Sequence, residues 1–181
     1  MRPVSPYEGS KAACDEVARS YRAIAGMPVA ITRLANVYGG GDLNFSRLVP
    51  ELMAAVVSDR APEIRSDGSP ERDFLHISDA VTGYLAIADL VAGGAGLGEA
   101  FNFGTGNPVS VGRVIEAVDH LSGGRLRPII EEEEGAVGEI DRQFVDSSKV
   151  CEATGWEARV GLEEGLEEAL GWYTDRAALC P

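Results

Sequence analysis

Cysteine and histidine are both scarce in this 181-residue chain. The three cysteines, Cys14, Cys151 and Cys180, are odd in number, lie far apart and form no CxxC pair. This pattern does not build a disulfide framework, so we expect reduced thiols of the kind found in cytoplasmic proteins. The two histidines, His76 and His120, are too few and too widely separated for a metal site, and we predict none.

Positive charge is also in short supply. The chain has 16 lysine and arginine residues against 29 aspartate and glutamate residues, which gives a formal net charge of −13. A protein that binds a nucleic-acid backbone needs a basic face, so this balance argues against a nucleic-acid partner. It leaves room for a small anionic ligand, because a few well-placed arginines can hold a phosphate inside an acidic protein.

Long apolar runs are absent as well. No stretch approaches the roughly 20 apolar residues of a membrane-spanning helix, and the N-terminus lacks the pattern of a secretory signal peptide. We therefore expect a cytoplasmic protein without a membrane partner. What is present is ordinary for a globular chain: 45% hydrophobic and 25% charged residues, in a length that suits one domain or one and a half.

Helical and extended patterns alternate along the sequence. Helices are expected over residues 6–25, 47–58, 79–91, a segment after Ser110, 147–154 and 162–175. Strands are expected over residues 29–34, 73–77, 99–103, 126–130 and a short piece that reaches Val145. The alternation predicts an α/β fold, although the strands are too few for a complete doubly wound sheet.

Several residues mark where these elements begin and end. Pro6 suits the first turn of a helix, and Gly26 suits a left-handed C-terminal cap. Ser78 and Ser110 are the expected N-caps of the helices that follow them. Residues 38–42 contain three successive glycines and are expected to form a loop.

Tyr7 and Lys11 form a pair near the start of the first expected helix. Side chains four residues apart lie on the same face of a helix. A free phenol has a pKa of about 10 and is a poor base at neutral pH, but a neighbouring ammonium group favours the phenolate. Such a pair can take a proton from a sugar hydroxyl while hydride leaves its carbon. The alternative is that both side chains merely share a solvent-facing helix, because YxxxK patterns also occur by chance.

Two later segments place polar side chains beside expected strands. Residues 33–39 end a strand and present Asn36, and ligands of open α/β sheets gather at such strand ends. An asparagine that bonds its own turn backbone is the alternative. Arg72 could clamp a diphosphate through two parallel hydrogen bonds. We interpret His76 and Asp79, which follow it, as structural residues.

Taken in order, four motifs resemble the extended short-chain dehydrogenase/reductase family of nucleotide-sugar epimerases and dehydratases. They lie at residues 5–11, 33–39, 72–79 and 101–104, and the similarity reaches about Tyr173. The resemblance implies an α/β fold that corresponds to the C-terminal part of such an enzyme. That part comprises the end of a Rossmann-like sheet and a small α/β substrate-binding domain.

The resemblance also divides the chain. Residues 1–35 are expected to be a remnant of the dinucleotide-binding domain. Residues 36–175 are expected to form mainly the nucleotide-sugar-binding domain, with some segments returning to the Rossmann sheet, and 176–181 a tail. Within the family, residues 36–50 look most like those of CDP-glucose 4,6-dehydratases.

The resemblance further implies a role for each candidate site residue. Tyr7 is expected to be the catalytic base. Lys11 is expected to favour its phenolate and to hold the nicotinamide ribose of NAD, which Ala35 would also contact. The expected contacts of the nucleotide sugar are Asn36, Arg47, Leu48, Arg72, Asn102 and Glu139. Among these, Arg72 would bind the diphosphate.

Two motifs of the family are missing ahead of Tyr7. They are the glycine-rich dinucleotide turn and the Asp–Glu pair through which a dehydratase expels water. We therefore expect this chain alone to bind NAD poorly and to turn over nothing. The resemblance implies that its parent is a homodimeric NAD-dependent 4,6-dehydratase. Three alternatives stay open: a nucleotide-sugar 4-epimerase, a non-catalytic nucleotide-sugar-binding module, and a plain α/β domain.

Overall fold

The computed structural model describes residues 5–64, 66–130 and 140–181. Its helices are α1 (Pro6–Ala25), α2 (Leu48–Val57), α3 (Ile77–Ala92), α4 (Val111–Leu121), α5 (Ser148–Thr154), α6 (Leu162–Asp175) and the 3-10 turn η1 (Ala177–Leu179). Its strands are β1 (Ile31–Leu34), β2 (Asn36–Tyr38), β3 (Glu63–Ile64), β4 (Glu71–Arg72), β5 (Phe74–His76), β6 (Ala100–Phe103), β7 (Val109–Ser110), β8 (Ile129–Ile130) and β9 (Arg142–Gln143). Helices and short strands alternate, so the α/β prediction is confirmed.

The strands form small sheets, most of them parallel pairs. β1 pairs in parallel with β6, with Arg33 opposite Asn102. β2 pairs in parallel with β5, with Asn36 opposite Phe74, and β3 pairs in parallel with β8. β4 lies between β7, which is antiparallel to it, and β9, which is parallel.

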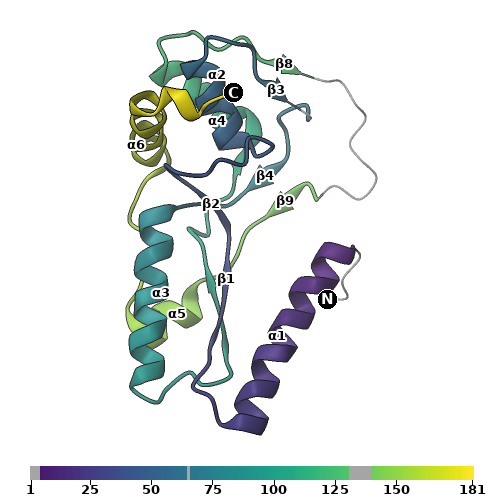
Figure 1. The fold of residues 1–181 in the computed structure, drawn as a ribbon, viewed down its shortest axis with the longest axis vertical. Coiled ribbons are helices and arrows are strands. Elements are labelled where there is room, and N and C mark those ends of the chain that lie inside the picture. Colours follow the sequence, from purple (N-terminus) through teal and green to yellow (C-terminus); the bar gives the residue numbers. More distant parts are fainter. Residues whose placement is uncertain (1–4, 65, 131–139) are drawn as a thin grey trace.

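The chain changes sheets between β1 and β2. The Ala35 amide still donates to the Phe103 carbonyl at 2.8 Å, whereas the next amide, that of Asn36, donates to the Asp73 carbonyl at 2.9 Å. One extended segment therefore runs from the β6 side of the molecule to the β5 side. Figure 1 shows it joining a group of helices at one end, α2, α4 and α6, to α3 and α5 at the other.

One hydrophobic core lies between the β5 and β6 strands and the helices α3 and α5. Phe101, Phe103 and Trp156 are buried in it, and the Trp156 ring meets that of Phe103 edge to face at 4.8 Å between centroids. Gly83 lets α3 approach this closely, because a Cβ there would lie 2.6 Å from the Phe103 ring. Burying each such side chain contributes roughly 1.5–3 kcal/mol.

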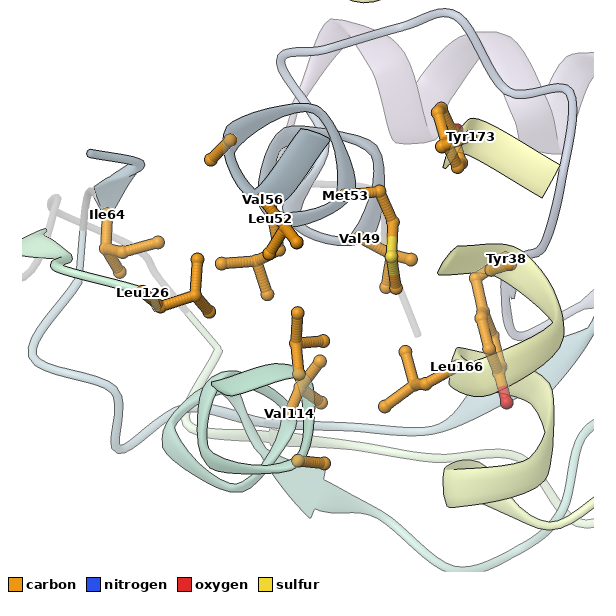
Figure 2. Close-up of a cluster of buried hydrophobic side chains, with 14 residues drawn as sticks. Tyr38, Val49, Leu52, Met53, Val56, Ile64, Val114, Leu126, Leu166 and Tyr173 are labelled. Atoms are coloured by element: carbon orange, nitrogen blue, oxygen red, sulfur yellow. The ribbon is translucent and has the colours of Figure 1, made fainter. Parts of the chain in front are cut away.

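A second core lies between α2, α4 and α6, as Figure 2 shows. Seven of the ten residues of α2 are buried, because this helix packs against both of the others. Met53 from α2, Val114 from α4 and Leu166 from α6 are fully buried there. This core fixes the start of α2 and the loop that leads into it, which together form one wall of the pocket described below.

Helix α1 stands apart from both cores, across β1 from α3 in Figure 1. None of its residues is buried. An ion pair joins it to β1, with the Arg33 Nε 2.8 Å from the Asp15 carboxylate. Its outward face carries Val17, Tyr21 and Ile24, which are 54%, 55% and 87% exposed.

Three of the expected element ends are confirmed. Pro6 is the first residue of α1, and Gly26 caps it in the left-handed conformation at φ 67°. Ser110 caps α4, since its hydroxyl accepts a hydrogen bond from the Arg113 amide at 3.1 Å. These signals depend on local sequence alone, which explains why they could be predicted.

The expected cap at Ser78 is wrong. Helix α3 begins one residue earlier than Ser78, at Ile77, and His76 occupies the cap position. The Ser78 hydroxyl instead lies 2.9 Å from Nδ1 of the buried His76 ring. The Ser78 hydroxyl, which the sequence predicts to cap the helix, therefore hydrogen-bonds the buried His76 imidazole instead.

Three strand boundaries also differ from expectation. The strand expected over 126–130 is reduced to β8, because the Leu126 amide donates to the Asp119 side chain at 3.0 Å instead of to a ladder. The piece expected to reach Val145 is β9, which ends at Gln143. Tyr38, expected in a loop, is the last residue of β2.

Candidate functional site

A pocket of about 520 Å³ opens where β1 passes into β2, beside the first turns of α1 and α2. It is lined by six of the residues that the sequence singles out, namely Tyr7, Ala35, Asn36, Arg47, Leu48 and Arg72. Lys11 and Asn102 do not line it, and Glu139 lies outside the described residues. The fold thus brings together four segments that are far apart in sequence.

Tyr7 enters the pocket from the first turn of α1. The Ser5 hydroxyl caps this turn by accepting a hydrogen bond from the Glu8 amide at 3.2 Å. The Tyr7 side chain is 70% exposed. The Lys11 ammonium lies 5.5 Å from the centre of the Tyr7 ring, so the two groups are neighbours even though Lys11 does not line the pocket.

A second phenol lines the pocket, but its environment is different. Tyr38 is 4% exposed, and its hydroxyl donates to the Leu162 carbonyl at 3.4 Å. Burial raises the pKa of Tyr38 well above its usual value, and the carboxylates of Asp79 and of the α6 glutamates raise it further. This phenol keeps its proton at neutral pH and is enclosed by the protein, whereas the Tyr7 side chain is exposed.

Arg47 and Leu48 mark the start of α2 on the opposite wall. Arg47 is the N-cap residue of the helix and Leu48 its first residue. The Arg47 Nη1 lies 2.9 Å from a carboxylate oxygen of Asp42, which also lines the pocket. Nothing in the sequence alone singles out Asp42, because its contact with Arg47 depends on the folded conformation of the loop between them.

Arg72 reaches the pocket from β4. Its Nη1 donates to the carbonyl oxygens of Glu71, at 2.9 Å, and of Ile140, at 2.6 Å. The neighbouring Glu71 carboxylate pairs with Arg142 at 2.8 Å, which ties β4 to β9. The Arg72 guanidinium is therefore held by backbone oxygens at the pocket edge.

Asn102 lies elsewhere. It projects from β6, and its side-chain amide donates to the Asp146 carbonyl at 3.4 Å. The structure does not bring it to the pocket of Tyr7 and Asn36. Its expected contact with the nucleotide stays a prediction.

His76 and Asp79 are built into the protein interior, in line with the structural interpretation. The Asp79 carboxylate, 4% exposed, accepts hydrogen bonds from the Arg159 amide at 3.0 Å and from the Val160 amide at 2.9 Å. His76 is 1% exposed and stacks edge to face on Tyr38. These residues hold α3 and the segment before α6 in place beside the pocket.

The sequence gives no sign that Asp73 is a buried carboxylate with a structural role. Asp73 is 3% exposed and accepts hydrogen bonds from the Thr105 amide at 3.0 Å, the Thr105 hydroxyl at 2.6 Å and the Gly106 amide at 3.1 Å. A Cβ on Gly104 would lie 2.4 Å from this carboxylate. Asp73 therefore fixes the loop after β6 against β5, directly behind the pocket.

A larger cavity of about 890 Å³ lies beside this loop. Its walls come from residues 104–109, 144–148 and 151–162, and Phe74 lines both cavities. Its charged side chains are mainly acidic, with Asp146, Glu152 and Glu157 against Arg159. Among the described residues, none of those that the sequence singles out as site residues lines it.

The described residues contain neither a metal-binding cluster nor a membrane-spanning helix. In residues 5–64, 66–130 and 140–181, no group of three or more His, Cys, Asp or Glu side chains could hold a metal ion. No helix in the same ranges combines the length and the apolar character that a membrane crossing requires.

Comparison with known proteins gives the same assignment as the motifs. Residues 1–104 match the profile of the NAD dependent epimerase/dehydratase family. The chain belongs to the NAD-dependent epimerase/dehydratase family. This confirms the resemblance seen in the motifs.

Relatives in the family include epimerases and dehydratases. The chain is 31% identical over 180 residues to a putative UDP-glucose 4-epimerase of Methanocaldococcus jannaschii, covering 95% of this chain and 54% of the relative. It is 30% identical over 177 residues to a dTDP-glucose 4,6-dehydratase of Streptomyces griseus, covering 96% of this chain and 51% of the relative. The chain spans about half the length of the curated relatives it matches.

The fold matches as well. The crystal structure of dTDP-glucose 4,6-dehydratase from Bacillus anthracis in complex with NAD superimposes with a TM-score of 0.81 and 27% identity. The match covers 99% of this chain and 55% of that enzyme. The expected fold, the C-terminal part of an extended short-chain dehydrogenase/reductase, is confirmed.

Proposed function

We propose that this chain is the nucleotide-sugar-binding portion of an NAD-dependent nucleotide-sugar 4,6-dehydratase. The observation that carries the proposal is the pocket at the β1–β2 junction, which gathers a phenol, an amide and two guanidinium groups. A phenol can exchange a proton with a sugar hydroxyl, and guanidinium groups bind phosphate oxygens. The named relatives support it, because they include enzymes of UDP-glucose and dTDP-glucose.

Five of the candidate residues have a task in the proposed reaction: Tyr7, Lys11, Asn36, Arg72 and Leu48. Tyr7 takes the proton of the sugar O4 hydroxyl, and the adjacent Lys11 ammonium stabilises the phenolate. Asn36 hydrogen-bonds the sugar nucleotide, and Arg72 binds the diphosphate. Leu48 packs against the nucleotide from the start of α2. Asn102 and Glu139 stay as further expected contacts, but neither adds support from the described pocket.

NAD is the proposed cofactor. Bound NAD would supply the oxidising power that removes hydride from the sugar carbon. The residues at the α1 end of the pocket fit a nicotinamide ribose, since Tyr7 and Lys11 offer hydrogen-bond donors and Ala35 leaves room beside them. In this proposal Tyr7 holds or releases the proton, with the Lys11 ammonium 5.5 Å from the centre of its ring.

A nucleotide-sugar 4-epimerase is the second candidate, supported by the 31% identity to the UDP-glucose enzyme. Both reactions begin with the same proton transfer by Tyr7, so the pocket serves either. The similarity of residues 36–50 to CDP-glucose 4,6-dehydratases favours CDP-glucose and the dehydratase. Product analysis of the parent protein separates the two: a 4-keto-6-deoxy sugar supports the dehydratase, and a sugar inverted at C4 the epimerase.

We propose that this chain alone does not turn over its substrate. The glycine-rich turn and the water-expelling Asp–Glu pair that the family places ahead of Tyr7 are not in its sequence. Incubation with CDP-glucose and NAD should therefore yield no product. Measurable turnover by this chain would refute the proposal.

A homodimeric, cytoplasmic parent is also proposed. The outward face of α1 exposes Val17, Tyr21 and Ile24, an apolar stripe of the kind that subunit contacts cover. Sedimentation of the parent protein and of an Ile24→Lys variant checks this proposal. A monomeric parent would contradict it.

Calorimetric titration of CDP-glucose into this chain tests the binding proposal. Arg72→Met should weaken binding roughly 10- to 100-fold, because a charge-assisted hydrogen bond to phosphate is lost. Arg127→Met is the matched control, since Arg127 is exposed and bonds only its own turn among the described residues. Wild-type protein that binds no nucleotide sugar, or equal losses in both variants, would overturn the proposal.

A further inference from the structure

The loop between β2 and α2 is fastened to α6 before it reaches the pocket. The Tyr173 hydroxyl donates to the Asp42 carbonyl, and Tyr173 is fully buried in the core of α2, α4 and α6, where Figure 2 shows it. Trp172 packs on Gly40 so closely that a Cβ there would lie 2.4 Å from its ring. The backbone of Asp42 is thus fixed from the hydrophobic core.

The rest of the loop is a series of short hydrogen-bonded turns. One oxygen of Asp42 accepts from the Asn44 amide at 3.0 Å, and the Asn44 side chain accepts from the Ser46 amide at 3.2 Å. The Asn44 carbonyl accepts from the Arg47 amide at 3.0 Å. The other carboxylate oxygen of Asp42 is left to pair with the Arg47 Nη1 at 2.9 Å.

This ion pair contributes little to folding. The Arg47 side chain is 62% exposed and that of Asp42 is 21% exposed. Ion pairs with an exposed partner are weak contributors to stability. Its effect is local: it restricts a long, flexible side chain to one wall of the pocket. In the part of the chain that the structure describes, the Nε and Nη2 groups of Arg47 have no hydrogen-bond partner.

We propose that Asp42 is a positioning residue that holds Arg47 toward an uncharged acceptor of the nucleotide, in its nucleoside part. This rests on the proposed nucleotide-sugar site. A carboxylate 2.9 Å from the guanidinium cancels most of its attraction for a distant phosphate, but leaves N–H donors of a residue that lines the pocket available to an uncharged acceptor. In this arrangement Arg72 binds the anionic part of the ligand, and Arg47 donates hydrogen bonds to the base or ribose.

The sign of the effect separates this role from simple phosphate binding. Asp42→Asn removes a negative charge and keeps the shape. If Arg47 bound the diphosphate, the loss of that charge would tighten binding of both CDP and pyrophosphate. If Arg47 is aimed at the nucleoside, the variant should bind CDP about 3- to 10-fold more weakly, with pyrophosphate affinity unchanged or raised.

The experiment is calorimetric titration of CDP and of sodium pyrophosphate into the wild-type chain, Asp42→Asn, Arg47→Met and the double variant. The Asp42→Asn effect should vanish in the Arg47→Met background, which a purely structural role would not produce. Tyr173→Phe removes the hydrogen bond that holds the loop to α6, so it should weaken CDP binding in the same way. Asp67→Asn, in an exposed turn, is the matched control and should change nothing.

The outcomes are distinct. The positioning role is overturned, while the nucleotide site stands, if Asp42→Asn binds CDP as tightly as wild type or more tightly. It is also overturned if Asp42→Asn loses the same affinity for CDP with and without Arg47. Failure of the wild-type chain to bind CDP overturns the proposed function, and this inference with it. Thermal unfolding of each variant confirms that the compared proteins are folded.

Discussion

At the scale of single residues, environment distinguishes side chains that the sequence presents as equals. Tyr7 could be selected from sequence because Lys11 follows it by one helical turn. The burial of Tyr38 could not be predicted that way, since it depends on α6, which lies more than 120 residues later. The same holds for Asp73, whose partner Thr105 is 32 residues away and meets it only in the folded chain.

Asp73→Asn should lower the free energy of unfolding by about 2–4 kcal/mol. Thr105 and Gly106 donate to different oxygens of the Asp73 carboxylate, so the NH2 group of asparagine would face one of these two donor sets and leave it buried without an acceptor. Urea denaturation measures the change. Asp67→Asn, the same substitution in an exposed turn, should stay within about 0.5 kcal/mol of wild type. Equal stability of the two variants would show that the buried carboxylate is not essential.

Stability should fall at high pH through Tyr173. Burial, and then the Asp42 carboxylate, raise the pKa of Tyr173 to about 12 in the folded chain, whereas a free phenol titrates near about 10. The contribution of the protonated Tyr173 phenol to the free energy of unfolding is complete below pH about 10. It is lost as pH rises toward 12, because this phenol releases its proton first in the unfolded state. Urea midpoints at pH 9, 10 and 11 should decline less steeply in Tyr173→Phe. Tyr84→Phe, at an exposed tyrosine, should keep the wild-type slope.

At the scale of elements, locally encoded features were predictable and those set by packing were not. Pro6, Gly26 and Ser110 act within a single turn, and the structure confirms them. Ser78 resembles a cap equally well, but its hydroxyl serves the His76 ring. The close approach of α6 to β2 had no signal beyond Gly165, one glycine among 22.

Two glycines of α6 provide a test of that approach. A Cβ on Gly165 would lie 2.3 Å from the Tyr38 hydroxyl, whereas one on Gly171 would meet nothing within 4 Å. Gly165→Ala should destabilise the chain by about 1–3 kcal/mol through overpacking. Gly171→Ala should stabilise it by about 0.5–1 kcal/mol, because alanine favours the helix more than glycine does. Shifts of the thermal midpoint with the same sign for both variants would contradict the packing described here.

At the scale of the whole molecule, the extended segment from β1 to β2 connects two cores and places the pocket at their junction. Six of the residues that the motifs single out do meet there. The motifs could not predict that Asn102 lies outside the pocket. Asn102 is on β6, which pairs with the chain only as far as Ala35, and the chain pairs with the β5 side from Asn36 onward. The motifs also gave no sign of the second cavity, whose walls come from the loop after β6 and the region around α5.

The central claim, that a nucleotide sugar binds at the β1–β2 junction, is tested most directly by NMR. Titrating CDP-glucose into the ¹⁵N-labelled chain should shift the amide signals of Ala35, Asn36, Leu48 and Arg72, all of which line the pocket. Signals from residues 151–162, around the larger cavity, should stay in place. Shifts confined to residues 151–162, or no shifts at saturating ligand, would contradict the account.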